Sequence, residues 1–464
     1  MPPAMFYVPP TDVKGRQELD GVFKNELDVR RRAFEESSEY YEGDQPPSFP
    51  IKPGQYDDNV VVNVTKQAVD RIIAFLFPSM PRFQLDGTMD TESEAEKYLK
   101  DTWVENGGAF LLNKIASNGS LSGHNFVRIL PPETAGGFSR IVNLNPRLIV
   151  AYWKADDVDK VLWYEMNWTV GKKEYIVDFV DLGGRWEIYE YSRPVGNMWV
   201  LDKTTPWNYR YGPIVDWQHN PRPNEFYGGA ETSKDMKKLN RSINKVASDI
   251  NRILRFHAFP KTIGIGMSAE DIKGTSIDSF WAVANPDAQV YNLEMKSDLG
   301  SSMAMLTFLN DAFLSQARVV IMKGTVKDFQ RVTNTGIRAV FLDMIAKNQM
   351  NRWAYGQGLQ EISRRILMLN NMPFDRRPDI LWDDPLPTDD TEAINTLAIE
   401  HDHKFVSTET ASLKRGYSWK EQLAQIETEA KDDALHPKPP VMGGAADGGI
   451  KKTAPIKQDT PPGA

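Results

Sequence analysis

The chain has 464 residues, of which 41% are hydrophobic and 25% charged, and its formal net charge is −8. This composition is that of an ordinary soluble protein, and the length allows several hydrophobic cores. The absence of cysteine excludes disulfides, thiolate metal sites and cysteine nucleophiles, and the negative charge argues against a protein that wraps nucleic acid in a broad basic surface.

The first half of the chain is predicted to form helices followed by strands. After a loose, proline-rich start over residues 1–19, apolar spacing predicts helices at residues 19–41, 59–77, 91–103 and 110–121. From Asn125 to Tyr189, β-type runs alternate with turn residues, which predicts an antiparallel meander. Four tryptophans in these runs are interpreted as core or subunit-interface residues in preference to a ligand-stacking platform. They are Trp153, Trp163, Trp168 and Trp186.

A long amphipathic helix is predicted between Gly228-Gly229 and Pro260. Its apolar residues follow a strict three-four alternation, which places one narrow packing seam along an otherwise polar helix. We expect the seam to pack against neighbouring helices and the rest of the circumference to face water. The seam residues are Met236, Leu239, Ile243, Val246, Ile250 and Ile253.

The chain is predicted to return along this helix after a small sheet. Short β-type runs within residues 260–296 predict the sheet, and apolar spacing predicts the returning helix at residues 299–322. A polar loop follows, which we expect to be mobile, and it carries Lys323, Lys327 and Arg331. A third helix is predicted from Thr335 to Asn370, with a kink at Gly356 and Gly358, because each glycine costs about 1 kcal/mol relative to alanine in a helix interior.

The last part of the chain is predicted to be an extended linker followed by short helices. The linker spans residues 382–387, and helices are expected at residues 388–400, after the capping sequence Ser407–Thr410, and at residues 418–434. Residues 437–464 are rich in Gly, Pro, Ala and Lys and are predicted to be disordered.

The sequence contains no recognisable catalytic or cofactor-binding motif. There is no phosphate-binding loop, no H-E-x-x-H and no G-x-S-x-G. His401 and His403 flank Asp402, but positions i and i+2 of a helix do not share a face, so a solvated pair is favoured over a metal site. We therefore expect no enzyme activity, no cofactor and no metal. No apolar run approaches the roughly 20 residues of a membrane span, and no signal peptide is recognised, so we expect no membrane contact and synthesis in the cytoplasm.

Several stretches, taken in order, resemble tailed-bacteriophage portal proteins, also called head–tail connectors. Tyr227-Gly-Gly229 precedes the first long helix, and Thr333-Asn-Thr-Gly-Ile-Arg338 opens the third. Asn59-Val-Val-Val-Asn-Val-Thr65 leading to Phe75-Leu-Phe-Pro78, Trp382-Asp-Asp-Pro-Leu-Pro387, and Val406–Thr410 are also similar to the family. The resemblance covers about residues 20–430 and rests on the order of these elements.

The resemblance implies an α+β subunit with long stem helices, a kinked tunnel helix, an antiparallel β-containing wing, a small β clip and a helical crown. The implied boundaries are 1–227 for the wing, 228–259 for the first stem helix, 260–296 for the clip, 297–322 for the second stem helix, 323–387 for the tunnel loop, kinked tunnel helix and wing return, 388–436 for the crown and 437–464 for the tail. Lys323, Lys327 and Arg331 would then lie on a loop facing a DNA channel, and a solvent-facing loop without DNA contact is an equal alternative.

The implied function is a ring-shaped channel of usually twelve copies at one capsid vertex of the virion. Double-stranded DNA would be packaged and ejected through it. The implied partners are other copies of the chain, the large terminase motor, the head–tail adaptor, and the major capsid and scaffolding proteins. Two alternatives remain open at this point: a monomeric binding module with a long helical hairpin, and a nucleic-acid-processing enzyme with an unrecognised site.

Overall fold

The computed structural model describes residues 9–19, 24–51, 53–54, 56–85, 93–134, 136–154, 156–258, 261–266, 286–287, 289–293, 299–321, 334–373, 375–386, 390–415, 417 and 419–435. The chain divides into two compact units, residues 1–388 and 389–464. Helices combine with antiparallel sheets, so the predicted α+β class is confirmed. The disorder predicted for residues 437–464 concerns a segment outside the described residues.

The amino-terminal part of the first unit is helical. Its helices are α1 (Val13–Leu19), α2 (Lys24–Glu42), α3 (Val64–Leu76), α4 (Glu94–Glu105) and α5 (Gly108–Ser122). The prediction of a loose start is wrong for α1. The predicted start of α3 at Asn59 is also wrong, because Asn63 caps the helix: its side chain accepts a hydrogen bond from the Lys66 N–H at 3.0 Å.

The predicted strands form two antiparallel sheets, where a single meander was expected. One sheet has the order β3-β2-β9 and the other the order β4-β5-β6-β7-β8. Their bounds are β2 His124–Leu130, β3 Arg140–Asn143, β4 Ile149–Lys154, β5 Asp157–Val170, β6 Lys173–Asp181, β7 Trp186–Pro194, β8 Val200–Trp207 and β9 Ile214–Gln218. The sequence interpretation missed β8 and β9. β9 closes the smaller sheet by pairing with β2, with Val127 opposite Val215.

Tryptophans of the larger sheet pack in the protein interior. Trp163 is fully buried and stacks on Tyr152 with ring centroids 4.3 Å apart. Trp153 stacks on Phe226 at 4.7 Å, and Trp186 packs against the main core. The interpretation of these three tryptophans as packing residues is therefore confirmed, and the fourth, Trp168, stacks on Tyr175 with ring centroids 5.8 Å apart.

α1 is held on the larger sheet by a buried ion cluster. Arg16 donates through Nη1 to Glu165 Oε2 at 2.8 Å and to Asp178 Oδ2 at 3.3 Å, and all three side chains are buried. Burial raises the pKa of the Asp178 carboxyl well above its usual range, although Arg16 opposes this shift. The cluster explains why a short, polar helix docks stably, since Arg16 supplies the charge that two buried carboxylates require.

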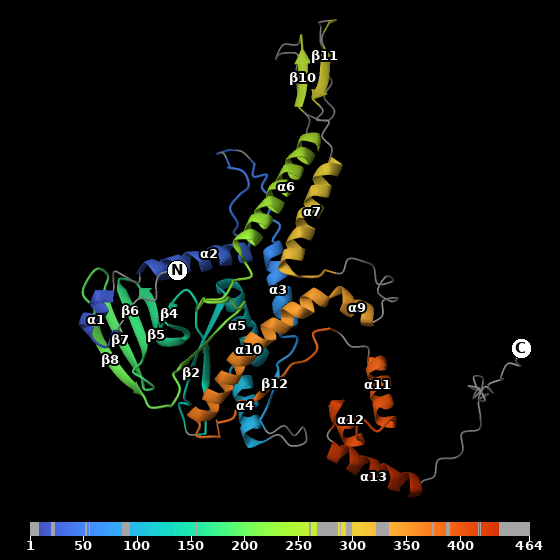
Figure 1. The fold of residues 1–464 in the computed structure, drawn as a ribbon. Coiled ribbons are helices and arrows are strands. Elements are labelled where there is room, and N and C mark those ends of the chain that lie inside the picture. The colour runs from blue at the N-terminus through green and yellow to red at the C-terminus, as the bar shows by residue number, and fades with distance from the viewer. Residues whose placement is uncertain are drawn as a thin grey trace, which may run out of the picture. The chain divides into compact units, whose positions relative to one another are not determined.

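The main core lies where α10 (Leu342–Leu369) packs against the smaller sheet and against α3, α4 and α5. Tyr355, Leu359, Ile362 and Ile366 supply the α10 side of this core. Next to it, β1 (Arg82–Gln84) pairs antiparallel with β12 (Asp379–Leu381). Figure 1 shows α10 crossing the unit at the base of the long hairpin that α6 (Lys234–Ala258) and α7 (Leu299–Ala317) form.

The second unit contains three helices among its described residues, α11 (Asp390–Asp402), α12 (Thr408–Lys414) and α13 (Trp419–Leu435). These are the helices predicted for this part of the chain. Ser407 caps α12, because its hydroxyl oxygen accepts a hydrogen bond from the Thr410 N–H at 3.1 Å. His401 contacts Thr408 Oγ1 through Nε2 at 2.9 Å.

Candidate functional site

The long hairpin of the first unit consists of α6 (Lys234–Ala258), β10 (Lys261–Ile265), β11 (Gln289–Leu293) and α7 (Leu299–Ala317). β10 and β11 pair antiparallel, with Ile263 opposite Tyr291. In Figure 1, α6 and α7 lie side by side and carry this pair of strands at their far end. The chain thus runs out along one helix, crosses at a small sheet and returns along the other.

The apolar seam of α6 packs against helices of the same chain. Met236 and Ile243 are buried in one cluster with Leu309 and Phe313 of α7 and with residues of α3. Leu239 and Val246 pack against this cluster. Farther along α6, Ile250 is buried and Ile253 is half-buried. The seam therefore joins the two helices of the hairpin to each other and to α3.

A row of polar side chains on α6 binds the extended segment before α3. Ser248 Oγ accepts a hydrogen bond from the Val60 N–H at 2.9 Å, and Asn244 Oδ1 accepts one from the Val62 N–H at 2.9 Å. Asn240 Nδ2 donates to the Val62 carbonyl at 3.0 Å. Asn240, Asn244 and Ser248 are buried, so the expectation that the polar circumference of this helix faces water is wrong for this row.

The geometry of this polar row follows from two matching repeats. Four residues of α-helix advance about 6 Å, and two residues of extended chain advance about 6.6 Å. Asn244 and Ser248, four positions apart on α6, therefore meet Val62 and Val60, two positions apart on a segment that runs in the opposite direction. Asn251, three positions after Ser248, extends the row, because its Nδ2 donates to the Asp58 carbonyl at 3.1 Å. The i, i+4 spacing of small polar residues is the sequence signal that could have revealed it.

Cations of α6 are also paired within the unit. Lys237 lies 2.8 Å from Glu36 of α2, and Arg252 and Arg255 form ion pairs with Asp58. These contacts tie α6 to the amino-terminal segments.

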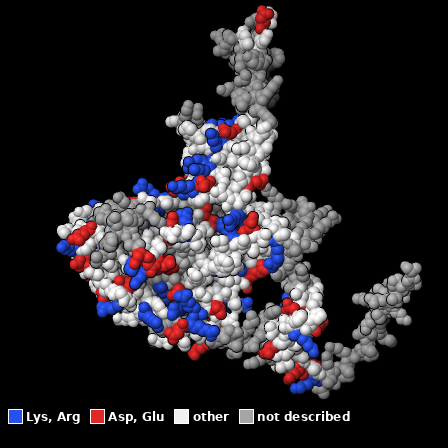
Figure 2. Space-filling view, viewed as in Figure 1, with Lys and Arg blue, Asp and Glu red and all other residues white. Residues whose placement is uncertain are grey.

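α7 presents a different surface. Its sequence contains one charged residue, Asp311, and its exposed apolar side chains include Met303, Met305 and Phe308, the last with 64% of its surface accessible. Figure 2 shows mostly uncharged atoms along α7 and charged atoms along α6. A second exposed apolar set lies on α9 (Asn334–Val340) and α10 and comprises Val340, Leu342, Met350 and Trp353. Apolar surface of this kind is typical of a face that another protein covers.

A charged network fixes the base of the hairpin. Glu231, just before α6, accepts hydrogen bonds from Lys347 of α10 at 2.6 Å, from Asn220 at 3.2 Å and from His219 at 3.1 Å. His219 Nδ1 lies 2.7 Å from the hydroxyl of Tyr355. Burial alone would raise the pKa of Glu231, but Lys347 and His219 outweigh it and lower the pKa to about 2.

This network should make the stability of the first unit fall in acid. Because the pKa of Glu231 is lower in the folded than in the unfolded chain, its stabilisation is complete above about pH 4.5 and is lost as the pH falls towards 2. The full effect is about 3 kcal/mol. Urea unfolding between pH 7 and pH 3 should show wild type losing its advantage over Glu231→Gln as the pH falls. A constant difference between the two proteins would contradict this assignment.

The two glycines predicted to kink the third helix lie in an uninterrupted part of α10. The boundary between α9 and α10 falls at Phe341, and the kink at the two glycines stays a prediction. A Cβ atom at Gly358 would lie 2.5 Å from Trp217, whereas one at Gly356 would meet only Trp382, at 3.9 Å. Gly358 therefore permits close contact between α10 and β9. The predicted loop residues Lys323, Lys327 and Arg331 lie outside the described residues.

Within the described part of the chain, no group of three or more His, Asp or Glu side chains is placed to hold a metal ion. None of the described helices combines the length and apolarity required to span a membrane.

A family model described as "Phage portal protein, SPP1 Gp6-like" matches residues 20–434. The chain belongs to this family of phage portal proteins. The resemblance inferred from the order of sequence motifs is thus confirmed over nearly the same range. No curated protein matches the chain.

Two solved structures are similar to this portal family member. "Neck of empty GTA particle computed with C6 symmetry" is 13% identical with a TM-score of 0.46, and the match covers 77% of this chain and 90% of that one. "Virion of native gene transfer agent (GTA) particle" is 12% identical with a TM-score of 0.45, covering 84% of this chain and 99% of that one.

Proposed function

We propose that this portal family member is a subunit of a ring-shaped channel at one capsid vertex. Copies of the chain, twelve by analogy with the family, would surround a central hole through which double-stranded DNA is packaged and later ejected. Family membership over residues 20–434 supports this function. The protein would accordingly reside in the virion.

The observation that carries the proposal is the exposed apolar surface of α7. The α6 seam is occupied within the chain, so the uncovered residues Met303, Met305 and Phe308 are available for a neighbouring copy. When two different faces of identical copies bind each other, the same contact can repeat from copy to copy. It closes into a ring when the rotation between successive copies adds up to a full turn. Each copy would then cover the apolar face of the next.

The other parts of the chain would have the roles that they have in portal subunits. The hairpin would form the stem, β10 and β11 the clip, and α11 to α13 the crown. The clip would dock the large terminase and later the head–tail adaptor, and the outer parts would meet capsid and scaffolding proteins. Twelve copies would carry about 12 × −8, or roughly −96, in formal charge, and such a wall would repel phosphate and let DNA slide. Lys323, Lys327 and Arg331 would contact the DNA transiently.

Electron microscopy of the purified full chain, with light scattering for mass, tests the proposal. Rings with a central hole are expected. Phe308→Lys should prevent ring formation and leave folded protein, because a charge would be buried in the interface. Val170→Lys is the matched control, since Val170, at the end of β5, is about as exposed as Phe308. A monomer of 52.6 kDa at all concentrations, or unchanged rings in Phe308→Lys, would favour the binding-module alternative or another interface.

A further inference from the structure

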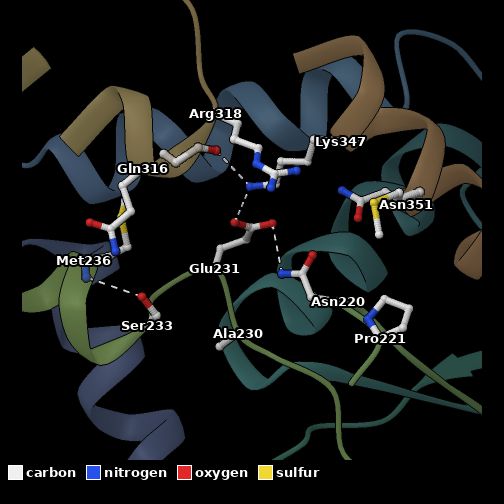
Figure 3. A pocket seen from close by; sticks show the side chains of 12 residues that line it. Asn220, Pro221, Ala230, Glu231, Ser233, Met236, Gln316, Arg318, Lys347 and Asn351 are labelled. Atoms are coloured by element: carbon white, nitrogen blue, oxygen red, sulfur yellow. Dashed lines mark hydrogen bonds and ion pairs between the residues drawn. The ribbon is translucent and has the colours of Figure 1, made fainter. Parts of the chain in front are cut away.

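A cavity of about 310 Å³ lies at the base of the hairpin. Four segments contribute to it: the turn after β9, the linker that leads into the first turn of α6, the end of α7 and the first half of α10. Figure 3 shows these segments around the Glu231–Lys347 ion pair. The volume of the cavity is at the lower end of the range for small-ligand sites.

The charges that line this cavity do not cancel. Both oxygens of Glu231 are occupied, Oε1 by His219 and Asn220 and Oε2 by Lys347, and Lys347 balances the charge of Glu231. Arg318 adds a further positive charge and forms no ion pair with the residues that the structure describes. In Figure 3 its side chain extends from the end of α7 towards Lys347 and Glu231. The cavity thus has an excess of one positive charge.

Asn351 supplies a second, independent feature of the cavity wall. This residue of α10 is 1% exposed, and its Nδ2 has no hydrogen-bond partner among the described residues. Figure 3 shows the amide on the cavity wall beside Lys347. A buried N–H donor without an acceptor is costly, and a ligand oxygen in the cavity would remove that cost.

The backbone of Arg318 is in a conformation that favours glycine. Its φ is 53°, and it ends α7: the Arg318 N–H donates to the Ser315 carbonyl at 3.1 Å, and the Val319 N–H donates to the Leu314 carbonyl at 3.0 Å. This pair of bonds is the usual helix end at which glycine occupies the left-handed position. An arginine is strained at this position. The turn therefore gives no reason for a long, positively charged side chain here.

We propose that this cavity binds a carboxylate group carried on a short apolar stem. Arg318 and Asn351 Nδ2 donate hydrogen bonds to the carboxylate, and Met236 and Met350 contact the stem. The carboxylate belongs either to a small organic acid or to a glutamate side chain of another polypeptide. This site is independent of ring formation and of the passage of DNA.

Isothermal titration calorimetry with the full chain tests the proposal. The probes are butyrate, its neutral analogue butyramide, and N-acetyl-glutamate N-methylamide. Butyrate or the blocked glutamate should bind, and butyramide should bind at least about tenfold more weakly, because charge-assisted hydrogen bonds are lost. Binding of the blocked glutamate identifies a polypeptide as a possible source, and binding of butyrate alone identifies a free acid.

Two variants separate ligand binding from folding. Arg318→Gly removes the guanidinium and relieves the backbone strain, so it should fold normally and bind the carboxylate about tenfold more weakly. Lys238→Gln, at an exposed site of α6 outside the cavity, is the control and should bind as wild type does. Equal affinity for butyramide, unchanged affinity in Arg318→Gly, or no binding of either carboxylate up to about 10 mM would overturn the proposal.

Discussion

Gly358→Ala should destabilise the first unit by about 3 kcal/mol or more. The added methyl carbon would lie 2.5 Å from Cδ2 of Trp217, a distance at which α10 and β9 must separate. Trp217 cannot move freely, because it is buried and packs edge-to-face on Tyr355 at 5.7 Å. Tyr355 in turn contacts His219, so the displacement would reach the network at the base of the hairpin. The free energy of urea unfolding measures the loss.

Gly356→Ala is the matched control for this substitution. It lies on the same helix two residues earlier, and its new methyl group would find ordinary contact with Trp382 at 3.9 Å. Alanine is favoured over glycine in a helix interior by about 1 kcal/mol, so this variant should be slightly more stable than wild type. Effects of the same sign and size at the two positions would show that helix propensity, and not contact with Trp217, determines the outcome.

Arg16→Met should cost about 3 kcal/mol at pH 8, because it leaves Glu165 and Asp178 buried without a cation. The loss should be smaller at pH 5. Burial raises the pKa of Asp178, and removing Arg16 raises it further, so the variant binds more protons when folded and gains stability relative to wild type as the pH falls. Urea unfolding of both proteins at the two pH values measures this difference.

Arg185→Gln provides the comparison for Arg16→Met. Arg185 pairs with Glu187 but is largely exposed, and exposed ion pairs contribute at most about 1 kcal/mol. The control should therefore change stability little at either pH. A loss in Arg16→Met that is equal at pH 5 and pH 8 would contradict the assigned charge cluster.

The sequence was sufficient for those parts of the fold that depend on periodic apolar residues. The seam from Met236 to Ile253 determines the long helix, and the alternating runs between Asn125 and Tyr189 determine the strands. Periodicity could not separate the strands into two sheets, because β9 joins β2 from far along the chain. It also could not place α1, whose docking depends on one arginine and two distant carboxylates.

The candidate site was only partly accessible from the sequence. The order of motifs indicated the portal family, and the family model matches the chain. The cavity was missed because its polar groups come from four separate segments, none of which contains a recognisable motif. The role of Gly358 was missed for a related reason: a glycine in a helix suggests a bend unless the neighbouring Trp217 is known.

The polar row between α6 and residues 58–62 has a mechanical consequence. Its hydrogen bonds come from Asn240, Asn244, Ser248 and Asn251, and they cross between two segments that run antiparallel along the same axis. A force that pulls the hairpin lengthwise would load these hydrogen bonds in shear, all at the same time. They would not break one after another. The hairpin would therefore resist axial pull up to a threshold and then slip in a single step.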